Sequence, residues 1–148
     1  MISKVELQGK LYAMIMSAQF SNEGVNFVTP DEASLQLGFM KHAAGKKIKA
    51  HIHMPATRNL YYTHEVLILK RGKLRVDFYD EQKNYLESRI LKAGDIILLE
   101  SGGHGFEVLE EIEMIEVKQG PYIADADKDR FEGIRAEEAI LPKGSKHG

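Results

Sequence analysis

The feature that most constrains the fold is a succession of short apolar segments separated by turn residues along most of the chain. Within residues 73–79, Leu74, Val76 and Phe78 alternate with polar residues, which is the period-two pattern of a half-buried strand. Short strands at such regular spacing are typical of an all-β sandwich or barrel. The segments predicted to be strands are residues 10–16, 33–40, 48–53, 65–69, 73–79, 85–91, 95–99, 104–109 and 112–117.

The composition changes after Gly120 and Pro121, where the strand-like segments end. From residue 124 the chain is mostly charged, and its few apolar anchors are Phe131, Ile134, Ile140 and Leu141. We expect one domain, with a β-barrel including the N-terminal strands in residues 1–123. Residues 124–148 are predicted to form a charged, partly helical C-terminal tail laid on the barrel or on a partner subunit, with residues 144–148 disordered.

Composition excludes several classes of function. The sequence contains no cysteine, so disulfides, thiolate zinc sites, iron–sulfur clusters and thiol nucleophiles are excluded. A net charge of -2 argues against nucleic acid or an anionic membrane surface as a partner. No apolar run approaches the length of a membrane span, and the first residues do not resemble a signal peptide. We therefore expect a cytoplasmic protein.

Imidazole and carboxylate side chains are concentrated around residues 51–65. In a strand, residues i and i+2 face the same side, so His51 and His53 project together, as two ligands of one metal ion must. Glu65 opens the next apolar strand, and His104 begins a distant strand after two glycines. His64 is expected to face away, because adjacent side chains in a strand point to opposite sides. The predicted site holds one divalent transition metal ion per chain (Fe, Mn, Ni or Zn), with two open positions if the ion is octahedral.

At these positions the chain resembles the cupins, a family of small double-stranded β-helical barrels of the jelly-roll type. The first cupin motif has a glycine, five residues, His-x-His, a short gap, a glutamate, six residues and a second glycine. Here Gly45 precedes His51-Ile-His53 by that interval, and Gly72 follows Glu65 by that interval. The second motif is matched by Gly94, Gly102 and His104. The resemblance implies a metal-binding barrel with His51, His53, Glu65 and His104 as its ligands.

The chain departs from the cupin pattern at two places. Eleven residues separate His53 from Glu65, where the family has three or four. In the second motif Glu100 replaces the usual proline, His104 comes one residue early, and Val108 stands where asparagine is usual. The long gap predicts an inserted loop, residues 54–63, at the mouth of the barrel.

Three side chains of this loop are the candidate catalytic residues. Arg58, Tyr61 and Tyr62 are predicted to line the entrance, where they would orient a polar or anionic substrate or move a proton. Alternatively, the loop packs its tyrosines on the rim of the barrel.

The resemblance implies three alternative functions. The first is a metal-dependent enzyme acting on a small oxygenated metabolite, carbohydrate-like or sugar-nucleotide-like, as an isomerase or epimerase. The second is a non-haem iron dioxygenase with the same four ligands, and the third is a non-catalytic small-ligand-binding protein. Cupins commonly pair through their N-terminal strands, and residues 11–20 form an apolar segment without an obvious partner, so we also predict a homodimer.

Overall fold

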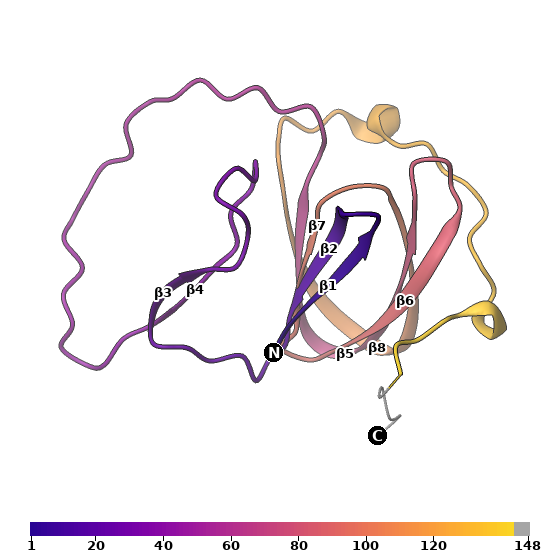
Figure 1. The fold of residues 1–148 in the computed structure, drawn as a ribbon, viewed down its shortest axis with the longest axis horizontal. Coiled ribbons are helices and arrows are strands. Elements are labelled where there is room, and N and C mark those ends of the chain that lie inside the picture. The colour runs from indigo at the N-terminus through magenta and orange to yellow at the C-terminus, as the bar shows by residue number, and fades with distance from the viewer. Residues whose placement is uncertain (144–148) are drawn as a thin grey trace.

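A computed structural model describes residues 1–143, and this part of the chain is all-β, as predicted (Figure 1). One sheet contains β1 (Ile2–Leu7), β2 (Lys10–Met16), β5 (Glu65–Tyr79), β6 (Tyr85–Lys92), β7 (Ile96–Leu99) and β8 (Gly103–Lys118). A separate hairpin consists of β3 (Gly24–Phe27) and β4 (Gly38–Lys41). The predicted disorder of residues 144–148 falls outside the described residues.

The long strand β5 organises the main sheet, whose order is β1-β2-β7-β5-β6. One edge of β5 pairs with β7 through residues 65–68 and with β6 through residues 73–79. The other edge pairs with β8 along the whole of both strands. All pairings are antiparallel, and the sheet curls into a half-barrel with β8 at its margin (Figure 1).

Several predicted strands differ from those observed. Residues 65–69 and 73–79 form one strand, as do residues 104–109 and 112–117, with register shifts where breaks were predicted. Gly72 lies at one such shift with φ +85°, and an added Cβ would lie 2.0 Å from the Glu111 carbonyl oxygen. The prediction of a strand at residues 48–53 is wrong, because this segment is irregular and exposed. β1 and β3 were not predicted.

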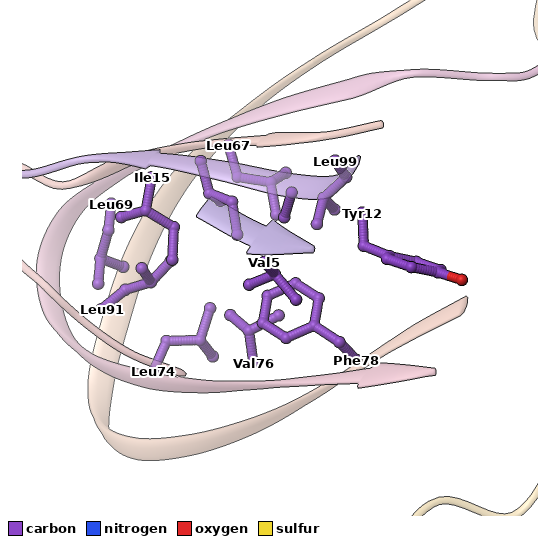
Figure 2. Packing of buried hydrophobic residues seen from close by; sticks show 12 residues of the cluster. Val5, Tyr12, Ile15, Leu67, Leu69, Leu74, Val76, Phe78, Leu91 and Leu99 are labelled. Atoms are coloured by element: carbon purple, nitrogen blue, oxygen red, sulfur yellow. The ribbon is translucent and has the colours of Figure 1, made fainter. Parts of the chain in front are cut away.

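The core lies on the concave side of the half-barrel. Leu74, Val76 and Phe78 of β5 are almost fully buried, and Figure 2 shows them pointing toward side chains such as Val5 and Ile15 from the opposite side. Each such side chain contributes about 1.5–3 kcal/mol when it is buried. β1, β2, β5, β6 and β7 supply the whole cluster of twelve buried residues.

The charged, partly helical C-terminal tail that was predicted is not seen. The only helical parts of the tail within residues 1–143 are two short 3-10 turns, Ala124–Asp127 and Ala136–Glu138. The rest runs extended along the outside of β5 and β6. The backbone N–H of Ile134 donates to the Tyr79 hydroxyl (2.9 Å), and the backbone N–H of Ser88 donates to the Ile140 carbonyl (2.8 Å). No helix in the described residues has the length and apolarity needed to cross a bilayer.

The N-terminal apolar segment has partners within its own chain. β2 pairs with β1 on one edge and with β7 on the other, so both of its edges are filled. The expectation that this segment lacks a partner within its own chain is therefore wrong. The homodimer itself remains a prediction.

Candidate functional site

A pocket of about 790 Å³ opens between the first residues of β8, the start of β5 and the C-terminal tail. The tail contributes one wall through residues 127–131, 133 and 134. The loop before β8 is tightly fitted: Gly102 has φ +68°, and an added Cβ would lie 2.3 Å from the Tyr79 carbonyl oxygen. The Ser101 hydroxyl donates to the Leu11 carbonyl (2.7 Å), which ties this loop to β2. His104 therefore enters the pocket from a well-anchored turn.

Glu65 and His104 meet at this pocket. In the β5–β8 ladder Glu65 pairs with Lys118 and His104 pairs with Phe78, so the two lie at opposite ends of the ribbon. The curl of the sheet brings these ends together, and Glu65 Oε2 lies 3.4 Å from His104 Nε2. The Glu65 side chain is 13% exposed and that of His104 is 30% exposed. Two of the four predicted metal ligands are thus adjacent.

The surroundings of Glu65 favour its carboxylate form. The His104 imidazole lowers the pKa of Glu65 most strongly, while burial acts in the opposite direction. A hydrogen bond with Glu116 and the charge of Lys118 lower the pKa further. An ionised carboxylate at this position can orient the His104 ring and stabilise a positive charge on it.

The outer face of β5 carries a buried polar network beside the same pocket. Arg75 Nε and Nη2 donate to the two carboxylate oxygens of Asp77 (2.8 and 3.0 Å), and Arg75 Nη1 lies 2.5 Å from Glu107 Oε2. The Ser88 hydroxyl donates to Asp77 (2.5 Å) and hydrogen-bonds to the Tyr85 hydroxyl (2.8 Å). Asp77 is the main cause of a raised pKa at Arg75, because it stabilises the cation.

Sequence reasoning missed the burial of this network. Arg75 and Asp77 alternate with core residues of β5, and this pattern predicts that they face solvent. In the structure they are only 5% and 4% exposed. The apolar residues of the C-terminal tail were the sequence feature that could have indicated that the tail covers this face. Phe131 packs edge-on against Tyr79, with ring centroids 5.0 Å apart, and so covers this face.

The other two predicted metal ligands lie elsewhere. His51 and His53 are exposed in the irregular segment 42–63, where their rings contact each other edge-on at 5.1 Å. His51 Nδ1 lies 2.9 Å from the Lys49 carbonyl oxygen. Within residues 1–143 no three His, Asp or Glu side chains gather closely enough to hold a metal ion. The four-residue ligand set therefore remains a prediction, of which Glu65 and His104 are the two residues that the structure brings together.

The candidate catalytic residues are also exposed. Tyr61 and Tyr62 contact each other edge-on at 4.9 Å and line a smaller hollow of about 210 Å³ beside the end of β8. Arg58 lines neither hollow. Thr63 and Asp127 border both hollows, so the tyrosines are neighbours of the main pocket without being part of it.

His64 is buried and does not line the pocket, which agrees with its expected orientation away from Glu65. Its Nε2 lies 3.9 Å from Glu100 Oε1, and its backbone N–H donates to the Gln119 side chain (2.7 Å). His64 Nδ1 and Glu100 Oε2 are buried without a hydrogen-bond partner among the described residues.

Comparison of the chain with protein-family models, curated proteins and solved structures found no match. The chemistry of the site is therefore argued from its residues. The pocket combines an acid–base pair, Glu65 and His104, with aromatic rings from Tyr79 and Phe131 and a cationic side chain, Lys128, from the tail. Such a site can bind a small polar molecule and transfer protons to or from it.

Proposed function

We propose that this protein binds a small oxygenated metabolite, carbohydrate-like or sugar-nucleotide-like, and catalyses proton transfer on it as a cupin-type isomerase or epimerase. The observation that carries the proposal is the contact between Glu65 and His104, 3.4 Å apart at the wall of the pocket. The pocket volume of about 790 Å³ lies within the range of small-molecule sites.

The two residues have different roles in this proposal. His104 is the more exposed partner and acts as the general acid or base, because imidazole is the side chain most often used for this purpose. Glu65 is a positioning residue whose carboxylate orients the His104 ring and compensates its positive charge after it accepts a proton.

Other residues of the pocket suit the proposed class of substrate. The partly buried ring of Phe131 offers apolar surface to the face of a sugar ring, and the buried Tyr79 packs against it edge-on. Lys128 lines the tail wall of the pocket between two carboxylates, Asp127 and Asp129, so this wall offers a polar surface of mixed charge to a small oxygenated molecule.

The predicted metal ion does not fit the residues as the structure arranges them. Two imidazoles, a carboxylate and a third imidazole form a suitable donor set for a transition metal. However, His51 and His53 lie in the exposed segment 42–63, away from the contact between Glu65 and His104. No catalytic step is therefore assigned to a metal, and metal binding depends on where this segment docks.

Two alternatives share the pocket. A non-haem iron dioxygenase would need all four ligands, whereas a non-catalytic ligand-binding protein needs only the pocket. We also propose that the half-barrel is the core of a double-stranded β-helix, which requires further strands beside the free edge of β8.

Proton transfer can be tested in deuterated water. Candidate sugars, sugar phosphates and sugar nucleotides are incubated with the protein, and deuterium incorporation at carbon is followed by NMR. We expect incorporation by the unaltered protein and a loss of about 10²–10⁴-fold in His104→Asn, the range typical of a general acid or base. Glu111→Gln is the matched control, because Glu111 lies on β8 but is highly exposed and outside the pocket.

Three other results would lead to different conclusions. Binding to the pocket without deuterium incorporation would favour the non-catalytic alternative. Oxygen consumption that depends on added iron would favour the dioxygenase. Equal incorporation by the unaltered protein and His104→Asn would refute the assigned role of His104.

A further inference from the structure

The outer edge of β8 has no partner strand among the described residues. β8 (Gly103–Lys118) pairs only with β5, so its other edge offers unpaired backbone groups along the margin of the half-barrel (Figure 1). Apolar side chains are also exposed on this strand, and they are Phe106, Val108, Leu109, Ile115 and Val117. A long exposed edge of this kind is a template for pairing with another strand.

A second segment has the complementary property. Residues 46–54, which we name the arm, alternate apolar residues with Lys and His, as a strand with one buried face does. Its apolar residues remain in solvent, with Ile48 63%, Ile52 88% and Met54 79% exposed. Figure 1 shows most of the surrounding segment 42–63 as a wide excursion to the left of the sheet, and only its last residues, 60–63, return beside the end of β8.

The charges of the two segments are opposite. Residues 42–63 contain three lysines and one arginine and no Asp or Glu. β8 contains five glutamates and one lysine. Three of these glutamates, Glu110, Glu111 and Glu113, are more than half exposed, although each also pairs with Lys73 or Arg71 of β5 at 3.2–4.0 Å. Opposite charge on two segments favours their association and sets their relative placement.

We propose that the arm of a second copy of this chain pairs with the free edge of β8, and that two copies exchange arms reciprocally around a two-fold axis. The buried core contains no residue from segment 17–62, so the half-barrel stays complete while its arm lies on another copy. In the conformation described, the arm already extends away from its own β8, and exchange requires no refolding of the sheet. Exchange of an identical element is a low-cost route to a dimer.

This exchange goes beyond the proposed function and does not rest on it. The exchanged interface depends only on the free edge, the apolar alternation and the charges.

Cysteine cross-linking tests the interface directly, because the chain contains no cysteine of its own. Ile52→Cys and Val108→Cys are introduced together in one chain, and a short bismaleimide reagent is added at low protein concentration. We expect covalent dimers on a denaturing gel, with a mass of twice 16.7 kDa. Leu7→Cys in place of Val108→Cys is the control, because Leu7 is similarly exposed but lies on β1.

Cross-links formed within one chain would overturn the proposal, since they would show that each arm folds back onto its own β8. The absence of any cross-link between residues 52 and 108 would overturn it as well. Light scattering of the unaltered protein must agree, because a mass of 16.7 kDa at micromolar concentration contradicts a stable exchanged dimer.

Discussion

Replacing Gly72 by alanine should break the β5–β8 ladder near its middle. Gly72 has φ +85°, a conformation that L residues rarely adopt. Its added Cβ would lie 2.0 Å from the Glu111 carbonyl oxygen, 2.7 Å from the Glu111 carbonyl carbon and 2.9 Å from the Glu110 carbonyl oxygen. These are backbone atoms of β8, so no side-chain rotation relieves the overlap, and the two strands must separate there.

Gly9 provides a control for the conformational part of this cost. Gly9 has φ +78°, but an added Cβ would have no atom within 4 Å. Gly9→Ala should therefore lower the free energy of unfolding only by the strain of the left-handed conformation, about 1–2 kcal/mol. Gly72→Ala carries the same cost plus the separation of β8 from β5, and we expect a total of about 4 kcal/mol or more, within the range of severe substitutions.

Urea and thermal unfolding followed by circular dichroism measure both variants. For a domain of this size about 1 kcal/mol corresponds to roughly 2–4 °C in Tm, so Gly9→Ala should lower Tm by a few degrees and Gly72→Ala by at least about 10 °C. Equal losses in the two variants would refute the reasoning, because they would mean that β8 does not approach Gly72 closely.

Three further outcomes are expected. Phe78→Ala should lose about 3–5 kcal/mol of unfolding free energy in urea titrations, because Phe78 is 1% exposed in the core and leaves a cavity. Asp77→Ala should lose about 1–3 kcal/mol, because the buried Arg75 guanidinium loses its bidentate partner and keeps only Glu107. The highly exposed Glu111→Ala should change stability by less than about 1 kcal/mol. Glu65→Gln should lower the free energy of unfolding at neutral pH, and this loss should become smaller in acid. Folding lowers the pKa of Glu65, so the carboxylate stabilises the protein above its unfolded-state pKa. That stabilisation disappears as pH falls through the lowered pKa of the folded state. A Glu65→Gln deficit that stays constant from neutral pH into acid would contradict the last of these.

Part of the candidate site could be predicted because it depends on residue type and local spacing. Glu65 and His104 were singled out by their positions at the starts of two strands, and the structure places them together at the pocket. The alternation of His51 and His53 led to a predicted strand that is wrong, because alternation describes only the preference of a segment. A strand also needs a neighbour for its backbone hydrogen bonds, and in the described residues the arm has none.

The amino-acid sequence by itself determined the all-β class and most of the strand positions, since these follow from period-two patterning. Only the tertiary structure decided that Glu65 contacts His104, because they lie at opposite ends of the β5–β8 ribbon and meet through its curl. It also decided that Arg75 and Asp77 are buried, because the covering segment comes from the distant tail. Such contacts depend on the summed twist and pairing of many residues, and no short pattern in the chain encodes that sum.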